Sequence, residues 1–434
     1  MTEPTPPLPV TKRRFLMLQG PHGPFFGSLA DMLRQAGCAV WRVGFNQGDR
    51  LMWGLRRGYI PYLGRAAEWP AALSDLIARH GITDIVLYGD TRPVHAAAVR
   101  LAQGADLAVH VFEEGYIRPF WVTYERGGSN GHSRLMRMTL AEMQAALAAR
   151  ATDLPMPPAR WGEMRQHIFW GAIYHFAVLV ANRSYRALEP HRDIGVAAEF
   201  QLYLRRLLLM PLHRAERALA TARIRLGGFP YHLVLLQLEH DASFRAHSSF
   251  ASMTDFIRAV LDAFARGAAP HHHLVFKAHP LEDGRAAIAA TIRAEAARLG
   301  LSRRVHFLRG GKLARLLAQA RSAVTVNSTA GHQALWRGVP LKVLGQAIYA
   351  KPGLVSDLPL ADFFAGAVRP DPRAYREFRH YLLETSQITG GFYAAAGRRR
   401  LIRQVVDMML SPEDPYDALT SGRAAPRQHL SVVR

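Results

Sequence analysis

The chain has 434 residues, which is too long for one typical hydrophobic core. Hydrophobic residues make up 49% and charged residues 21%, a composition typical of globular proteins. Its 55 lysine and arginine residues outnumber 34 acidic residues and give a net charge of +21, which limits the charged partners to nucleic acid, anionic membranes or phosphorylated substrates. A genome-wide preference for arginine and alanine accounts for part of this excess. Because the basic residues are spread along the chain without a basic tail, zinc-finger spacing or an RNA-binding aromatic signature, we expect no nucleic-acid partner.

Cys38 is the only cysteine, so the chain forms no intrachain disulfide and no cysteine-based zinc site, which is typical of a reducing compartment. Residues 1–10 are rich in proline and lack the apolar core of a signal peptide. The longest apolar run, residues 169–181, is interrupted by Tyr174 and His175 and falls short of the roughly 20 residues that a spanning helix needs. We therefore expect a soluble or peripheral protein of the cytoplasm.

In the first half of the chain, short buried strands each end in polar residues. We expect strands at 15–18, 39–45, 82–88 and 107–112, and helices at 28–36, 69–80 and from His95 to near Gly104. The first helix carries Ser28 as its cap and Gly37 at its end. The glycine-rich turn before it lacks the dinucleotide-binding and P-loop patterns. Strands of a doubly wound sheet deliver their polar ends to one edge, where ligands bind.

Two pairs of side chains at that edge are candidates for catalysis. Glu113 and Glu114 are adjacent carboxylates whose repulsion favours protonation of one of them, as general acid/base work requires. An ion pair of this carboxylate pair with Arg118 or Arg92 is the alternative. Asp90 and His95 form the second pair, as a base and its orienting partner, unless His95 only caps its helix.

The middle of the chain, residues 138–226, is helical in pattern and rich in arginine and aromatic residues. We expect these helices to pack on the sheet and bridge two domains. The alternative is a basic and aromatic surface that contacts an anionic membrane.

The second half begins at the turn 227–230 and repeats the strand and helix pattern. We expect strands at 232–238, 273–277, 305–308, 323–326 and 341–344, and helices at 254–266 and 312–320. A further helix is expected to start at Ser328 and Thr329 and to run to Trp336. Glu282 and Asp283 are expected to begin the helix that follows the second of these strands.

A phosphate-binding site is predicted at the carboxyl ends of two of these strands. Lys277 and His279 follow one strand, and Ser328 and Thr329 open the helix after another, so that cations, hydroxyls and helix amides converge on an anion. A plain turn at His279-Pro280 and a plain helix cap at Ser328 are the alternatives. Since no histidine pair or D-x-D pattern has metal-ligand spacing, we expect no metal, and these groups would stabilise a leaving phosphate instead.

These patterns predict an α/β protein of two Rossmann-like domains. The expected parts are a flexible N-terminus at 1–14, a first domain at 15–137, a helical connector at 138–226, a second domain at 227–385, a helical return at 386–412 and a frayed tail at 413–434. A cleft between the carboxyl edges of the two sheets would pair the carboxylates of the first domain with the phosphate site of the second.

With these residues the chain resembles the KpsS/LipB family of capsular polysaccharide biosynthesis proteins, the 3-deoxy-manno-octulosonate (Kdo) transferases of capsule assembly, over about residues 15–395. The motifs of the first half that carry the resemblance are Leu18-Gln19-Gly20-Pro21 with Gly23-Pro24-Phe25-Phe26, Phe45-Asn46 with Gly48-Asp49, Gly89-Asp90 with Arg92-Pro93 and His95, and Phe112-Glu113-Glu114-Gly115-Tyr116-Ile117-Arg118-Pro119. Those of the second half are Gln237-Leu238-Glu239 with Asp241, His247-Ser248, Lys277-Ala278-His279-Pro280, Asn327-Ser328-Thr329 and Gly391-Phe392-Tyr393.

The resemblance implies a GT-B-like glycosyltransferase that moves β-linked Kdo from CMP-Kdo, with retention of configuration, to a phosphatidylglycerol-type lipid acceptor. Lys277, His279, Ser328 and Thr329 would bind CMP without a cofactor, and Glu114, in preference to Glu113, would be the catalytic carboxylate. The other residues that the matched motifs place in the substrate site are Gly20, Arg118, Gln237, Glu239, Pro280 and Asn327.

The same resemblance implies partners at the cytoplasmic face of the inner membrane, namely its anionic lipid surface, a second Kdo transferase and the capsule export complex. Retention leaves open whether the carboxylate is a nucleophile or the base of a front-face transfer. Two other functions stay open as well: a non-catalytic lipid-binding component of the export complex, and a nucleotide-sugar enzyme that uses UDP.

Overall fold

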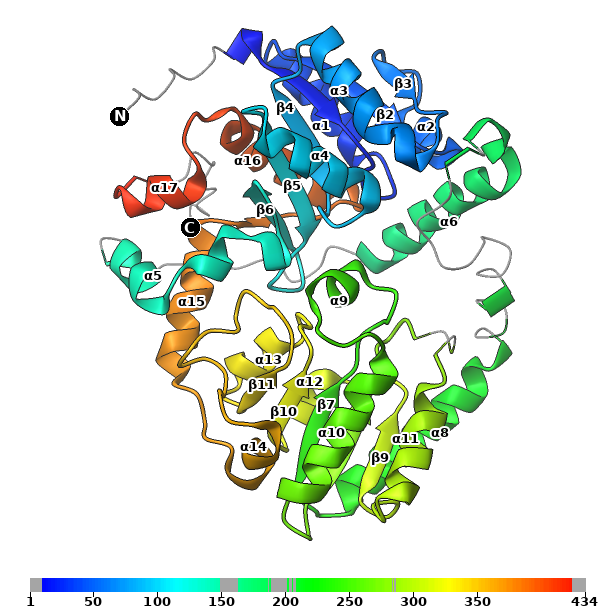
Figure 1. The fold of residues 1–434 in the computed structure, drawn as a ribbon, viewed down its shortest axis with the longest axis vertical. Coiled ribbons are helices and arrows are strands. Elements are labelled where there is room, and N and C mark those ends of the chain that lie inside the picture. The colour runs from blue at the N-terminus through cyan, green and yellow to red at the C-terminus, as the bar shows by residue number, and fades with distance from the viewer. Residues whose placement is uncertain are drawn as a thin grey trace. The chain divides into compact units, whose positions relative to one another are not determined.

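The structure, a computed structural model, describes residues 10–148, 163–185, 187–188, 201–202, 205, 208–282, 284 and 286–423 (Figure 1). The chain divides into two compact units. Unit 1 comprises Met1–Arg134, Ala141–His191 and His380–Arg434, and unit 2 comprises Leu135–Leu140 and Arg192–Arg379.

Unit 1 is built on a seven-stranded sheet in the order β12-β6-β5-β4-β1-β2-β3. Its strands are β1 (Arg14–Met17), β2 (Ala39–Gly44), β3 (Tyr59–Pro61), β4 (Asp84–Tyr88), β5 (Ala108–Glu114), β6 (Trp121–Arg126) and β12 (Gln387–Thr389). The first five strands pair in parallel, and β6 runs antiparallel to both β5 and β12. The carboxyl ends of β1 to β5 therefore share one edge of the sheet.

Helices cover both faces of this sheet. The helices of the unit are α1 (Phe25–Gln35), α2 (Gln47–Trp53), α3 (Trp69–His80), α4 (Pro93–Gln103), α5 (Leu140–Leu147), α6 (Glu163–Ala181), α16 (Ala395–Leu410) and α17 (Pro415–Thr420), with α15 (Pro372–Glu384) entering from unit 2. Short 3-10 helices lie at Val10–Lys12, Ala66–Glu68, Asn130–His132, Arg134–Arg137 and Asn182–Tyr185. Phe25 of α1 and Val405 of α16 belong to the apolar core on one face, and Leu73 of α3 and Ala98 of α4 to the core on the other.

Unit 2 is built on a five-stranded, wholly parallel sheet in the order β11-β10-β7-β8-β9. Its strands are β7 (Tyr231–Leu235), β8 (His273–Lys277), β9 (Val305–Leu308), β10 (Ala320–Thr325) and β11 (Leu341–Val343). Its helices are α8 (Met210–Leu226), α9 (Ala242–His247), α10 (Met253–Gly267), α11 (Ile288–Arg298), α12 (Leu313–Leu317), α13 (Gly331–Trp336) and α14 (Leu360–Gly366). The apolar faces of α10, α11 and α14 meet the sheet in one core.

The predicted α/β class and the two Rossmann-like sheets are confirmed. The strands predicted at 273–277 and 305–308 and the helix at 69–80 are correct at both ends. These segments combine a clear hydrophobic period with strong end signals, such as Gly81 in the left-handed conformation after α3.

The first helix begins three residues earlier than predicted. It starts at Phe25 with Pro24 as the preceding residue, and the backbone amide of Ser28 already donates to the carbonyl oxygen of Pro24. Ser28 is therefore not a cap. The cause is packing, because the rings of Phe25 and Phe26 are both buried against Phe112.

Among the described residues, parts of the predicted terminal segments are more ordered than expected. Arg13, predicted to be flexible, is buried and forms an ion pair with Asp84. The helical return begins with a strand, β12, which pairs with β6. The predicted frayed tail contains α17, whose Tyr416 is only 2% exposed. In each case a long-range partner orders a segment whose local pattern is weak.

Candidate functional site

In unit 1 the carboxylate of Glu114 is held by two tyrosine hydroxyls. Oε1 of Glu114 accepts a hydrogen bond from Tyr88 at 3.1 Å and another from Tyr393 at 3.1 Å. Glu113 and Glu114 are the last two residues of β5 and lie opposite Thr123 and Val122 of β6. The prediction that the strand ends at residue 112 is wrong, because the chain reverses after Gly115 and returns as an antiparallel partner.

The two tyrosines come from distant parts of the sequence. Tyr88 ends β4, and burial, followed by the nearby Glu114 carboxylate, raises its pKa well above the usual value. Tyr393 lies 279 residues after Glu114, and its ring stacks on His167 of α6 with the ring centroids 4.2 Å apart. Tyr88 is thus a neutral donor, and the two tyrosines place the carboxylate beside α6.

A chain of polar contacts, one of them a cation–π contact, extends from this carboxylate along the sheet edge. The guanidinium of Arg92 lies 5.5 Å from the ring centroid of Tyr88 and donates to Oε1 of Gln19 at 2.8 Å. Gln19 in turn donates to the hydroxyl of Tyr174 at 3.0 Å, which also accepts from Asn46 at 2.7 Å. Polar residues after β1, β2 and β4 therefore converge, as the parallel sheet predicts.

Asp90 and His95 do not form the predicted dyad. Oδ2 of Asp90 accepts from the backbone amide of Ser129 at 2.8 Å and lies 3.1 Å from Nδ1 of His132. His95 is fully buried, with Nδ1 2.7 Å from the carbonyl oxygen of Gly89. Both residues stabilise the turn after β4, and the structure brings His132 to Asp90 instead.

The other two candidates of unit 1 have structural contacts. The exposed Arg118 donates from Nε to the carbonyl oxygen of Gly115 at 3.3 Å, in place of the ion pair considered for Glu113 and Glu114. A Cβ atom at Gly20 would lie 2.7 Å from the ring of Phe26. Gly20 therefore provides room for that buried ring.

In unit 2 the carboxyl ends of three neighbouring strands bring the predicted phosphate site together. Thr325 of β10, Leu235 of β7 and Lys277 of β8 are in register, so the residues that follow these strands share one edge. Lys277 is 7% exposed, and burial lowers the pKa of its ammonium. Its one hydrogen bond among the described residues is a long one, 3.4 Å to the carbonyl oxygen of Ala278. None of the ion pairs formed by the described residues involves Lys277.

His279 lies in a turn after β8. Its Nδ1 accepts from the backbone amide of Leu281 at 3.2 Å, next to the exposed Pro280. The helix expected from Glu282 begins only at Ile288, because Gly284 has a positive φ of 86° and Glu282 accepts its backbone amide at 2.9 Å. Asp283 lies outside the described residues.

Ser328 and Thr329 precede the helix that they were expected to open. α13 begins at Gly331 and has six residues. The hydroxyl of Ser328 accepts from the amide of Ala330 at 3.2 Å, and the carbonyl of Thr329 accepts from the amide of His332 at 3.2 Å. Both residues thus form the turn between β10 and α13.

Gln237, Asn327 and Glu239 support this edge from within. Gln237 and Asn327 exchange two hydrogen bonds, of 2.8 and 3.0 Å, and the amide of Asn327 also donates to the carbonyl oxygens of Ser243 and His247. Glu239 accepts the backbone amide of Met253, the first residue of α10, at 2.8 Å. Gln237 and Asn327 thus join the loop after β7 to the loop that carries Ser328, and Glu239 holds the start of α10.

Glu114 belongs to unit 1 and Lys277 to unit 2, and their pairing across a cleft stays a prediction. Sequence reasoning missed the roles of Tyr88, Tyr393 and Tyr174. Tyr174 offered a signal, since a hydroxyl and a histidine interrupt the longest apolar run of the chain. For Tyr393 the only signal in the sequence was its place at the end of a matched motif, because its partner Glu114 is remote in sequence.

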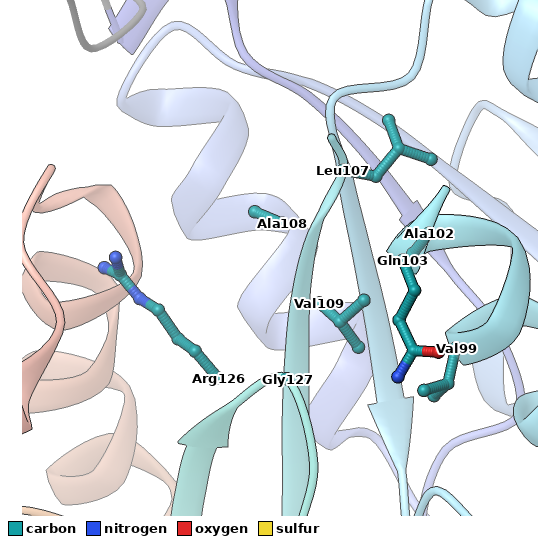
Figure 2. A pocket seen from close by; sticks show the side chains of 8 residues that line it. All are labelled: Val99, Ala102, Gln103, Leu107, Ala108, Val109, Arg126 and Gly127. Carbon is teal, nitrogen blue, oxygen red and sulfur yellow. The ribbon is translucent and has the colours of Figure 1, made fainter. Parts of the chain in front are cut away.

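Other features of the described residues lie away from these edges. Within the part of the chain that the structure describes, no group of three or more histidine, cysteine or acidic side chains is arranged to hold a metal ion. None of the helices among these described residues is long and apolar enough to cross a membrane. A shallow hollow of about 330 Å³ lies where α4 ends and β5 begins, opposite the edge of Glu114 (Figure 2). Arg126 at its rim turns away and donates to the carbonyl oxygens of Met408 and Ser411.

One family model and several known proteins resemble this chain. The model described as "Capsule polysaccharide biosynthesis protein" matches residues 83–393. The chain is 31% identical over 387 residues to the capsule polysaccharide export protein KpsS of Escherichia coli, covering 88% of this chain and 97% of that protein. It is 31% identical over 386 residues to the capsule polysaccharide modification protein LipB of Neisseria meningitidis serogroup A, covering 87% and 91%. The solved structure of Thermosulfurimonas dismutans KpsC, beta Kdo 2,7 transferase, matches at 14% identity and a TM-score of 0.40 over 82% of this chain and 90% of that chain.

Proposed function

Because the chain belongs to the capsule polysaccharide biosynthesis protein family, we propose that it is a glycosyltransferase that transfers Kdo from CMP-Kdo to a phosphatidylglycerol-type lipid acceptor. Two parallel-sheet units of nucleotide-binding type suit a GT-B-like enzyme. The observation that carries the proposal is the Glu114 carboxylate, which two tyrosine hydroxyls hold at the carboxyl edge of the first sheet.

Glu114 is the catalytic carboxylate of this proposal. Tyr88 and Tyr393 both donate to Oε1, and among the described residues Oε2 has no hydrogen bond. Oε2 either attacks the anomeric carbon of Kdo as a nucleophile or accepts the acceptor's proton as the base of a front-face transfer. In both mechanisms the fixed orientation of the carboxylate lowers the barrier, because less freedom is lost on reaching the transition state.

Lys277 stabilises the leaving group. Its buried ammonium lacks a carboxylate partner among the described residues, so the phosphate of CMP can neutralise it. His279, Ser328 and Thr329 lie on the loops of the same edge and add donors to the phosphate. This donor set acts through charge and hydrogen bonds, without a metal or other cofactor.

The test is CMP release from CMP-Kdo with lysophosphatidylglycerol as acceptor. We expect Glu114→Gln to lower turnover by about 10²–10⁴-fold, since it removes the charge while keeping the size of the side chain. Glu113→Gln is the matched control. The amide of Glu114 donates to Oε1 of Glu113, and a glutamine oxygen keeps that bond, so this variant should retain most of the turnover.

Full turnover of a folded Glu114→Gln variant would refute the assigned role. Two outcomes with the parent protein would support other functions. Thermal stabilisation by UDP but not by CMP would favour a UDP-dependent nucleotide-sugar enzyme, and vesicle binding without turnover would favour a non-catalytic component of the capsule export complex. The proposal also implies peripheral association with the anionic cytoplasmic face of the inner membrane, near a second Kdo transferase.

A further inference from the structure

Helix α6 has two faces with different surroundings. On its inner face Tyr174 is 4% exposed and holds Gln19 and Asn46, Ala177 is buried, and His167 stacks on Tyr393. This face packs against α2 in unit 1 (Figure 1). The inner face thus belongs to the cluster that holds Glu114.

The outer face of α6 carries large apolar side chains in water. Six of them are between 51% and 67% exposed: Met164, Ile168, Phe169, Phe176, Leu179 and Val180. At roughly 100° per residue these positions fall within an arc of about 160°, opposite Tyr174 and Ala177. Arg165 and the half-buried His175 fall within the same arc. Scattered exposed apolar residues are ordinary, whereas six large ones gathered on one side of a helix mark an interaction surface.

The charge around this face matches an anionic lipid surface. Arg165 and Arg183 are exposed on α6 and on the turn after it, and the one acidic residue of α6, Glu163, is its first residue. The neighbouring α2 and the turn after it expose Arg50 and Arg57. Leu51 and Leu55 are 48% and 100% exposed beside them. Exposed apolar side chains interspersed with arginine are the pattern of a segment that lies in the plane of a bilayer interface.

We propose that the outer face of α6 inserts into the interface of an anionic bilayer. The apolar side chains enter the boundary between headgroups and acyl chains, and the arginines contact lipid phosphates. Because the inner face of the same helix carries His167 and Tyr174, insertion brings the Glu114 cluster to the membrane surface. The consequence for a lipid acceptor rests on the proposed function, whereas insertion itself does not.

The first test is co-sedimentation of the full chain with vesicles of phosphatidylcholine alone or mixed with phosphatidylglycerol. We expect the parent to bind the anionic vesicles, and Phe169→Ser with Phe176→Ser to weaken that binding about tenfold or more. The matched control is Leu63→Ser with Val368→Ser, which removes two other apolar side chains that are 49% and 76% exposed and should leave binding unchanged. Since all four side chains project into water, the melting temperature should stay constant in both variants.

Equal binding of the parent and the Phe169 and Phe176 variant would overturn the proposal. It would also be overturned if these substitutions only converted a dimer into a monomer in sedimentation equilibrium, because the face would then be an interface between two copies of the chain.

The second test measures how deeply the outer face of α6 enters the bilayer. Cys38 is the only cysteine and is buried, so Phe176→Cys offers one reactive thiol for an environment-sensitive fluorophore. We expect a blue shift and quenching by brominated acyl chains on anionic vesicles, and no change for a label at Val368→Cys. An unshifted spectrum at position 176 on vesicles that bind the protein would refute insertion.

Turnover distinguishes this proposal from the proposed function. With a dispersed lysophosphatidylglycerol acceptor the Phe169 and Phe176 variant should react as the parent does, and with an acceptor embedded in vesicles it should react more slowly by about the loss in binding. If the parent binds vesicles but has no turnover, the proposed function fails and the insertion of α6 stands.

Discussion

Lys277 is a buried cation without an ion-pair partner among the described residues, and burial lowers its pKa. Such a residue is unfavourable for the folded state unless a ligand supplies the opposite charge. The apolar environment that destabilises the ammonium also strengthens its attraction to a phosphate.

A Lys277→Met variant tests that interpretation. We expect the ligand-free variant to melt at the same or a higher temperature, because methionine has a similar length and needs no counter-charge. The apparent affinity for CMP, measured by thermal shift over a CMP titration, should fall at least tenfold. A variant that keeps the CMP response of the parent would exclude Lys277 from the binding site.

Glu125 is a second buried ionisable group, outside the candidate site. It is 2% exposed and accepts hydrogen bonds from three hydroxyls, those of Tyr116, Ser133 and Tyr416. Burial raises the pKa of Glu125 to about 7, although these hydrogen bonds oppose the shift. The folded state therefore binds a proton here that the unfolded chain releases at lower pH.

This shift predicts that the free energy of unfolding of unit 1 decreases as the pH rises from about 4.5 to 7, since the folded state holds more protons than the unfolded state over that interval. The loss is at most about 3 kcal/mol for a shift of this size. Glu125→Gln should reduce the dependence of the melting temperature on pH between 5 and 8, followed by circular dichroism. An unchanged pH profile would show that Glu125 titrates normally.

At the scale of elements, the last segments of the chain complete the sheet of unit 1. β12 pairs with β6, α16 covers the core beside α1, and Tyr416 of α17 donates to Oε2 of Glu125 at 2.9 Å. Local patterns could not predict β12, because three residues form a strand only when a partner strand is already in place.

Removal of α17 should therefore destabilise the first sheet. For a chain that ends at residue 412 we expect a loss of about 3–5 kcal/mol, from the burial of Tyr416 and Leu419 and from a lost hydrogen bond to Glu125. A chain that ends at Arg423 keeps these contacts and serves as the control. Equal melting temperatures of the two truncated chains would contradict the role of α17.

At the scale of the whole molecule, the net charge of +21 predicts an electrostatic contribution to membrane binding. Because salt screens exposed charges over a distance of about 8–10 Å at 0.10–0.15 M, binding to anionic vesicles should weaken as salt is raised from 0.05 to 0.5 M. Binding that does not depend on salt would assign the basic excess to composition alone.

Hydrophobic period and end signals were sufficient for the α/β class, for most strands and for the edge where polar residues gather, since these depend on a few neighbouring residues. Lys277 at the end of β8 and Glu114 at the end of β5 were found in this way. Whether Glu114 meets Tyr393, and whether Asp90 meets His132 or His95, depends on packing between segments up to 279 residues apart. Hydrogen bonds between residues so far apart in sequence form only when the sheet has folded. Local sequence patterns therefore predict which chemical groups lie at the sheet edge, and the tertiary structure determines which groups they contact.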